Sequence, residues 1–573
     1  MAPERLLHAI NAVMRVAVSA DGLKALGLAL AFGALSSAPA ADYYVATSGS
    51  DSNPGTSAQP FRTITHAYAY AAPGVTIHVM PGTYYDYTSR WGIHLGASGT
   101  PAQPIVLHSE VRGAAIIDGQ NAANRNEGFY IDGDYNVVDG FEIRNCPNGG
   151  ISIWSDGNQI LNNRIHHNGN LPSPSPNGKD GIYSSHDTTG NVYQANCIDH
   201  NGRPGSNLDH GLYLCGNNEV VLNNVLFANA ATGLQVAGYT TVNNMKVYNN
   251  VMAWNGTSGI VLWQALNGVD IKNNIFYQNG RYGIFSYAAT GGGVVVDNNF
   301  SYGNGSGDFD FTGGGSTYTN SQAGNIFADP GLVDGTLANF DPHLASGSPA
   351  IQAALNLYPD LTTDMAGAAR PSSGAWDLGV YLASDTVPGQ PRVTLSTTTP
   401  IASRTGSSSG VFTITRSGDT TQALSVTCVP GGSAVNGQDY TALGITLTIP
   451  AGSASTTVLI TPLPSAGLVG PETVVLTVAP GSGYSPAWLN QATVVIGGNN
   501  VLSTISLAPG NNAKITWASA PGKIYRVASK NSLSDPGWTD SSGLITAASG
   551  STSFTDPTTS SRAQRFYVVY QTN

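Results

Sequence analysis

Seven short segments between residues 128 and 286 share one pattern of apolar and polar positions. Each opens with a glycine, continues with an apolar residue, and then places one residue of variable type before a small or apolar one. The glycines are Gly128, Gly150, Gly181, Gly211, Gly233, Gly259 and Gly283, and successive members are 22 to 31 residues apart. Such alternation is typical of short β-strands that bury one face.

A second repeat falls between these segments. Six times an asparagine is followed five residues later by another: Asn163/Asn168, Asn196/Asn201, Asn224/Asn229, Asn250/Asn255, Asn274/Asn279 and Asn299/Asn304. A period near 22 residues that holds short strands and no helix indicates one turn of a parallel β-helix. We therefore predict an all-β chain with a right-handed parallel β-helix over residues 41–386. The asparagines are expected at its turns, bonded to the backbone of the next turn and free to adopt left-handed torsions.

The alternation also predicts which side chains enter the coil. The residue after each glycine is expected to face inward and to stack on its equivalents: Phe129, Ile151, Ile182, Leu212, Leu234, Ile260 and Ile284. The next residue is expected to face outward: Tyr130, Ser152, Tyr183, Tyr213, Gln235, Val261 and Phe285. The turns after Gly150 and Gly181 are longer than the others and must extend loops, where functional sites are often built.

The rest of the chain reads as further β structure. Gly347-Ser-Pro-Ala-Ile and Trp376-Asp-Leu-Gly-Val-Tyr381 resemble the closing segment of exported β-helices, and Pro388 to Pro391 indicates a linker. Residues 392–497 carry alternating strands and Asn436-Gly-Gln-Asp-Tyr440, and they resemble a Calx-beta sandwich. Residues 500–573 are predicted to form one more small β-sandwich.

Composition narrows the possible functions. Only 10% of the residues are charged while 41% are hydrophobic, and the chain contains 69 glycines and 32 prolines, as turn-rich β structure requires. The net charge is −11 and no basic tract occurs, so a nucleic-acid partner is not expected. Arg5, Arg15 and Lys24 precede an apolar run that ends in Ala38-Pro-Ala40, which predicts a signal peptide over residues 1–40. We expect a secreted or cell-surface protein without a membrane span, of unknown oligomeric state.

Polar and aromatic residues gather at the outer positions of the middle turns. One turn contributes Lys179, Asp180, Tyr183 and His186, and the next contributes Asp209, His210 and Tyr213. Neighbouring parallel strands lie about 4.8 Å apart, so these seven side chains are expected to share one groove. Contacts with sugar rings are also expected from outward residues on nearby turns: Tyr130, Trp154, Gln235 and Trp263.

The N-terminal part of the predicted β-helix resembles a known protein family. Its motifs are Tyr43-Tyr-Val-Ala-Thr-Ser-Gly-Ser-Asp-Ser-Asn-Pro-Gly-Thr, Pro60-Phe-Arg-Thr-Ile and Pro73-Gly-Val-Thr-Ile-His-Val-Met-Pro-Gly-Thr-Tyr-Tyr. From about residue 42 to 310 the chain resembles extracellular β-helix proteins that act on polysaccharides, including the family-nine pectate lyases. The resemblance implies an acidic polysaccharide as substrate and calcium held by aspartates. Lys179-Asp180-Gly181 and Asp209-His210-Gly211 resemble the two acidic motifs, whereas Gln235 stands where the family places a lysine base.

These residues support a hypothesis of β-elimination on a uronate-containing glycan such as pectate or alginate. The reaction needs a group that neutralises the carboxylate, a base for the C5 proton and an acid for the leaving O4. We expect His210 and Tyr213 to act as base and acid, or in exchanged roles, and Lys179 or Gln235 to face the carboxylate. Asp180 and Asp209 are expected to hold calcium or to orient the histidine, and no other cofactor is expected.

Three other interpretations stay open. Asp180 and Asp209 on adjacent turns form a carboxylate pair of the kind that glycoside hydrolases use. Residues from Gly181 to His186 and Asp187 resemble part of the signature of mannuronan epimerases. A non-catalytic adhesin or glycan-binding protein is the third interpretation.

Overall fold

The computed structural model describes residues 42–573 except 48, 86–91, 123–126, 171–177, 338–339, 384–390, 400, 406–407, 418, 467–471, 480, 482, 487–489, 502, 509–511, 533–537, 560–563 and 573. The predicted signal peptide and most of the predicted linker lie outside the described residues. Among the described residues, no helix is both long enough and apolar enough to cross a bilayer. The regular structure of the described ranges is almost entirely β, with one short helix, α1 (Ile64–Tyr68), and a 3-10 turn, η1 (Gly313–Gly315).

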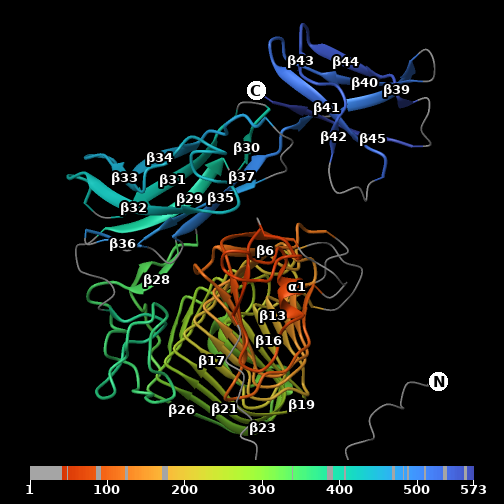
Figure 1. Cartoon of the computed structure of the whole chain (residues 1–573). Helices are drawn as coiled ribbons and strands as arrows, with labels where there is room; N and C mark the ends of the chain where they lie inside the picture. Colours follow the sequence, from red (N-terminus) through yellow and green to blue (C-terminus); the bar gives the residue numbers. More distant parts are fainter. Residues whose placement is uncertain are drawn as a thin grey trace, which may run out of the picture. The chain divides into compact units, whose positions relative to one another are not determined.

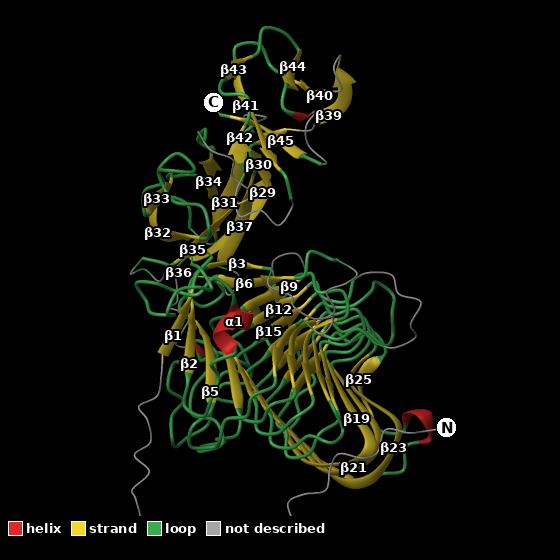
Figure 2. Ribbon diagram, turned by 45° about the vertical axis from the view of Figure 1, so that its right-hand side comes forward, coloured by secondary structure: helices red, strands yellow, loops and turns green. Residues whose placement is uncertain are grey.

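The strands of the coil follow one another in each turn along three parallel faces, called here the first, second and third sheet (Figures 1 and 2). Three long strands join the first and second into one 17-stranded sheet. The first sheet contains β4 (Ile93–Leu95), β7 (Glu127–Ile131), β10 (Gly149–Ile153), β13 (Ile182–Ser184), β16 (Leu212–Leu214), the first halves of β19 (Leu234–Tyr248), β21 (Ile260–Lys272) and β23 (Tyr282–Asp297), and β25 (Gly307–Asp310).

The second sheet contains β1 (Asp42–Val45), β2 (Thr76–Val79), β5 (Ile105–Ser109), β8 (Asn136–Asp139), β11 (Gln159–Leu161), β14 (Val192–Gln194), β17 (Val220–Leu222), the second halves of β19, β21 and β23, and β26 (Asn320–Ala323). The third sheet contains β3 (Gly82–Tyr84), β6 (Ala115–Asp118), β9 (Glu142–Arg144), β12 (Arg164–His166), β15 (Cys197–Asp199), β18 (Val225–Phe227), β20 (Val251–Ala253), β22 (Ile275–Tyr277) and β24 (Phe300–Tyr302). Its nine strands correspond to about nine turns.

The predicted right-handed parallel β-helix is confirmed, and so is its internal stack. The register pairs Phe129 with Ile151 and continues through Ile182, Leu212, Leu234, Ile260 and Ile284. All seven side chains are buried in one hydrophobic core. The outward series from Tyr130 to Phe285 stays in register as well, so alternation within each strand fixed both faces correctly.

The asparagines form two buried ladders along the coil. In one of them, Asn196 Oδ1 accepts from the backbone N–H of Asn163 at 3.0 Å, and Asn224 Oδ1 accepts from Asn196 in the same way at 2.9 Å. The expectation of left-handed torsions at these residues is wrong. The left-handed residue is the one before, such as Asn223 with φ 52°, because the chain turns there and the next asparagine must point back into the coil.

The C-terminal residues form two further pairs of sheets, and β27 (Leu332–Asp334) pairs with β28 (Asp341–Leu344) before them. The first pair contains β29 (Arg392–Thr399), β30 (Ile401–Ser403), β31 (Gly410–Arg416), β32 (Leu424–Gly431), β33 (Thr446–Ile449), β34 (Ser455–Ile460), β35 (Glu472–Val478), β36 (Ser485–Pro486) and β37 (Gln491–Gly497) around one core. The second contains β38 (Asn500–Val501), β39 (Ser503–Ala508), β40 (Asn512–Ala518), β41 (Ile524–Lys530), β42 (Thr539–Asp540), β43 (Ile545–Thr546), β44 (Ser551–Asp556) and β45 (Phe566–Gln571). The Calx-beta resemblance and the domain boundaries stay predictions.

A carboxyl group is buried inside the coil at Glu219, next to β17. Its Oε1 accepts from the side chains of Ser184, Thr188, Asn191 and Tyr193, whereas Oε2 has no hydrogen-bond partner. Burial raises the pKa of Glu219 from 4.5 to about 7, because the charged form loses its hydration. The folded protein therefore binds a proton here that the unfolded chain releases near pH 4.5.

We expect this proton to make the coil less stable as pH rises. A raised pKa in the folded state contributes stability that is complete below pH 4.5 and is lost as pH passes 7, by up to about 3 kcal/mol. Glu219→Gln should therefore raise the melting temperature at pH 8 and flatten its decline between pH 5 and 8. Glu110→Gln, at an exposed glutamate, is the matched control. An unchanged pH profile in Glu219→Gln would show that the buried carboxyl does not titrate in this range.

Candidate active site

Two segments of the coil meet at the predicted site, just before β13 and β16. The backbone N–H of Lys179 donates to Asp209 Oδ1 at 3.0 Å, and the backbone N–H of His210 donates to Asp180 Oδ1 at 2.9 Å. Each aspartate thus holds the backbone of the other's segment. These two hydrogen bonds fix the start of both strands and therefore the directions in which the Lys179 and His210 side chains point.

Asp209 is fully engaged in these contacts. Arg203 donates to its carboxylate from Nε at 2.7 Å, from Nη2 at 2.6 Å and from the backbone N–H at 2.8 Å. The Arg203 contacts lower the pKa of Asp209 against the effect of its burial, and the side chain is 0% exposed. Burial raises the pKa of Asp180 to about 8, helped by the charge of Asp209. The two carboxyls therefore differ in protonation at neutral pH.

His210 and Tyr213 come together as predicted. Their rings stack at a centroid distance of 5.4 Å and an angle of 27°, because His210 lies before β16, ahead of the bend at Gly211, rather than within the strand. The backbone N–H of Thr232 donates to His210 Nδ1 at 3.3 Å, so the neutral imidazole carries its proton on Nε2. Burial lowers the pKa of His210 to about 4, and the ring is therefore neutral at physiological pH.

The phenol of Tyr213 is also neutral, as the His210 imidazole is. Its hydroxyl donates to the hydroxyl of Tyr239 at 3.0 Å. Burial and this contact raise the pKa of Tyr213 far above its ordinary value of 10. The phenol is therefore a proton donor and a poor base.

Lys179 is nearly buried on the same outer face. Its ammonium donates to Asn148 Oδ1, and burial together with the charge of Arg203 lowers its pKa. Burial also raises the pKa of Glu127, which faces Lys179, to about 7, and Glu127 Oε2 has no hydrogen-bond partner. Sequence reasoning missed Glu127 and Asn148 as site residues. Glu127 could have been found, since it precedes its glycine just as Asp180 and His210 do.

An aromatic row runs across successive turns beside this cluster. Tyr130 stacks on Trp154 at 6.3 Å, Trp154 packs against Tyr183 at 5.4 Å, and Tyr183 stacks on Tyr213 at 5.8 Å. Tyr239, which the sequence did not single out, extends the row and is 58% exposed. These rings are the platforms on which sugars stack in proteins.

The remaining predicted residues lie around Tyr239. Trp263 meets the Tyr239 ring edge to face at 5.3 Å, and the ring of His186 lies 6.4 Å from it. His186 Nε2 is 3.4 Å from Asp187 Oδ2. Gln235 is nearly buried and pairs in register with Tyr213. The structure therefore brings the predicted residues together on the outer face of the first sheet, although their roles stay predictions.

The fold and this outer face define a right-handed parallel β-helix that carries charged and aromatic side chains on its first sheet. Residues 43–209 match the family described as "Pel9A-like, right handed beta helix region". A pectate lyase L of Dickeya chrysanthemi is 34% identical over 143 residues, which cover 24% of this chain and 34% of the relative. The pectate lyase PEL9 of Emericella nidulans is 40% identical over 81 residues, 14% of this chain and 19% of the relative.

Among solved structures, the pectate lyase Pel9A has a TM-score of 0.45 and 21% sequence identity, and the match covers 60% of this chain and 97% of that one. The chain spans about a third or less of the length of the curated relatives named above. It thus carries a Pel9A-like β-helix region and has pectate lyases among its relatives.

Proposed function

We propose that the protein is a polysaccharide lyase that cleaves a uronate-containing glycan by β-elimination. The observation that carries the proposal is the stacked pair of neutral His210 and Tyr213 beside Lys179, on the outer face of a Pel9A-like β-helix. The relatives named as pectate lyases support the same reaction class and make polygalacturonate the first substrate to test.

The protonation states of these three side chains suggest their roles. Burial lowers the pKa of Lys179, which makes its neutral amine easier to form, and we assign this amine as the base for the C5 proton. The C5–H electrons then form the C4–C5 double bond as the C4–O4 bond breaks, and Tyr213 donates its phenolic proton to O4. His210 Nε2–H binds the carboxylate on which charge develops. His210 is not assigned as the base, in contrast to the hypothesis from the sequence, because the Thr232 N–H occupies its Nδ1 lone pair.

Calcium at Asp180 and Asp209 fits the geometry poorly. Calcium takes six to eight oxygen ligands. Both oxygens of Asp209 are already held by Arg203 and by backbone N–H groups at 2.6 to 3.0 Å, which leaves no lone pair for a cation. We therefore derive no step through calcium and assign both aspartates to positioning the two segments.

The same geometry weighs against the hydrolase hypothesis. A glycosidase needs one protonated and one ionised carboxyl flanking the bond, and the pKa values of Asp180 and Asp209 differ in that sense. However, the Asp209 side chain is 0% exposed, so a sugar carbon cannot approach its oxygens. The ionised partner is therefore out of reach of a substrate.

The test is to incubate the purified full chain with polygalacturonate, alginate and other uronate glycans. Lyase action produces an unsaturated uronide, which is measured by its ultraviolet absorbance, and we expect this signal both with EDTA and with added calcium. New reducing ends without absorbance would show a hydrolase, altered uronate composition without cleavage would show an epimerase, and retention on glycan alone would show a binding protein. Each of these results would overturn the proposal.

We also propose that the protein acts outside the cell. This rests on the signal-peptide pattern of residues 1–40, which lie outside the described residues. Fractionation of the producing cells and sequencing of the mature N-terminus would test it, with cleavage after Ala40 as the expected result.

A further inference from the structure

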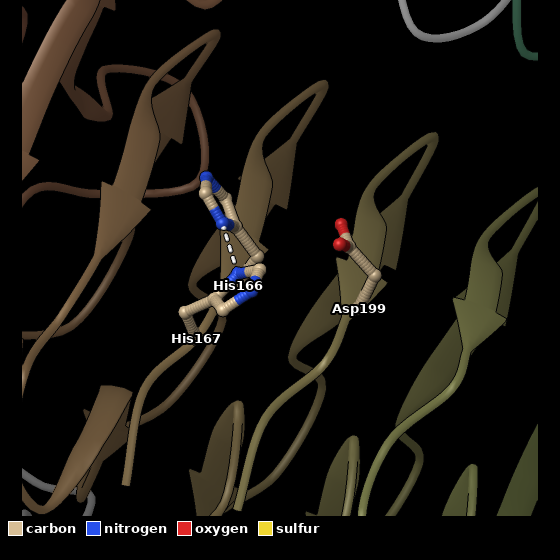
Figure 3. A group of neighbouring side chains, drawn as sticks. All are labelled: His166, His167 and Asp199. Atoms are coloured by element: carbon tan, nitrogen blue, oxygen red, sulfur yellow. Dashed lines mark hydrogen bonds between the residues drawn. The ribbon is translucent and has the colours of Figure 1, made fainter. Parts of the chain in front are cut away.

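A group of side chains with metal-ligand chemistry lies on the third sheet, which is not the sheet of the candidate active site. Figure 3 shows His166 at the end of β12, His167 beside it, and Asp199 at the end of β15. His166 and Asp199 pair in register on adjacent turns, and one ligand atom from each of the three residues lies within 4.8 Å of the other two. Ile165 and Ile198 fill the core, so alternation directs His166 and Asp199 away from it.

The backbone explains how two consecutive histidines reach the same point. Neighbouring residues in a strand project to opposite faces, but His167 has φ 54° and lies in the left-handed region. This turn brings its ring back toward that of His166, and the two Nδ1 atoms are 2.8 Å apart. His167 holds the left-handed turn position that precedes each ladder asparagine, as Asn223 does before Asn224, so the repeat of the coil itself supplies this conformation.

The tautomer of His166 is set for metal binding. Its Nε2 lies 3.2 Å from Glu142 Oε1, and the same oxygen accepts from Arg144 Nη1 at 2.6 Å. The ion-paired carboxylate only accepts, so Nε2 carries the proton and Nδ1 presents its lone pair. Metal-bound histidines usually donate their other ring N–H to a carboxylate, and Glu142 holds that position for His166.

The third ligand is an oxygen of Asp199. Arg164 donates to Oδ1 at 3.1 Å and to Oδ2 at 3.3 Å, and His200 Nδ1 lies 2.9 Å from Oδ2. The other lone pair of Oδ1 accepts a hydrogen bond from the thiol of Cys197 at 3.1 Å, and a thiol is a weak donor. A metal ion at this oxygen replaces a weak hydrogen bond and the thiol keeps its proton, whereas at Asp209 it would have to replace a charged Arg203 contact.

We propose that His166 Nδ1, His167 Nδ1 and Asp199 Oδ1 bind a divalent first-row transition metal of the zinc type. Two imidazoles and one carboxylate suit zinc and leave a fourth position for water, whereas calcium prefers all-oxygen sites. Bonds of about 2.0–2.1 Å at a tetrahedral centre require the nitrogens to separate by about half an ångström more. The exposed His167 ring provides that movement.

Binding requires one proton to move. In the metal-free pair, His167 Nδ1–H donates to His166 Nδ1. The metal takes the place of that proton, which shifts to Nε2 of the exposed His167 ring, so no net proton release is expected from the neutral pair. The bound ion joins β12 to β15 and should therefore stabilise two adjacent turns.

The experiment uses the full chain freed of metal with EDTA and then dialysed. Zinc is titrated by calorimetry, and cobalt absorption reports the coordination geometry. We expect one zinc per chain, not displaced by excess calcium, and a higher melting temperature with zinc. His167→Asn should weaken binding at least tenfold and abolish the thermal shift, because asparagine keeps the left-handed turn but removes a ligand.

His108→Asn is the matched control, since His108 is a half-exposed histidine whose Nδ1 lies 2.9 Å from a carboxylate oxygen of Asp139. Both residues lie in the second sheet and not in the third, which carries the proposed metal site. It should bind zinc as the unaltered chain does. The melting temperature of His167→Asn without zinc shows whether the variant is folded. Failure of the unaltered chain to take up zinc, or equal binding by a folded His167→Asn, would overturn the proposal. Neither result depends on the lyase hypothesis.

Discussion

Tyr213→Phe is expected to lower kcat/KM for glycan cleavage by at least about a hundredfold, because general acid catalysis contributes factors of about 10² to 10⁴. The change removes one oxygen, the proposed donor to O4, and leaves the ring stacked between Tyr183 and His210. Folding should be unaffected, since the hydroxyl donates to the exposed Tyr239 at the surface. The measurement is initial rates of unsaturated uronide formation together with melting temperature.

Companion variants separate the three proposed roles. His210→Ala and Lys179→Met are each expected to reduce the rate by orders of magnitude, and Lys179→Met should abolish the rise in rate with pH that deprotonation of a base produces. Tyr302→Phe, at an exposed tyrosine on the third sheet, is the control and should retain full activity. Full activity in both Tyr213→Phe and His210→Ala would move the site elsewhere, first to His186 and Asp187.

Leu212→Asp is expected to prevent folding of the coil or to lower its melting temperature severely. Leu212 is 0% exposed and lies in register between Ile182 and Leu234 in the internal stack. Loss of a buried leucine side chain alone costs about 2–5 kcal/mol, and the new carboxylate is buried without a partner. Together these costs approach the whole stability of a typical domain.

Ser152→Asp provides the comparison at an outward position of the same sheet, where Ser152 pairs with Tyr183. A charge that points to solvent should change the free energy of unfolding by less than about 0.5 kcal/mol. Equal melting temperatures for Leu212→Asp and Ser152→Asp would contradict the assigned faces.

Regularity made the coil predictable from the sequence. Period-two alternation after each glycine determined that Ile182 and Leu212 point inward and Tyr183 and Tyr213 outward, because strand geometry leaves no other arrangement once one face is buried. The repeated asparagines determined the ladders for a similar reason, since each turn must satisfy the same backbone groups.

The candidate site was predictable only in its location. Parallel turns place Lys179 beside Asp209, whereas His210 and Tyr213 come together within one turn, and the structure shows both juxtapositions. The protonation states of these residues depend on irregular contacts, which the sequence repeat does not predict. Arg203 reaches Asp209 from a loop, and the Thr232 N–H on the next turn fixes the His210 tautomer.

The sequence by itself therefore determined the β-helix, its inner and outer faces and the turns that carry the polar cluster, because these follow from a repeated local pattern. Only the tertiary structure decided which carboxylates are neutralised, which imidazole nitrogen carries a proton, and that His166 and His167 converge on Asp199. Protonation and metal affinity depend on burial and on partners tens of residues away, and these are set when the turns stack.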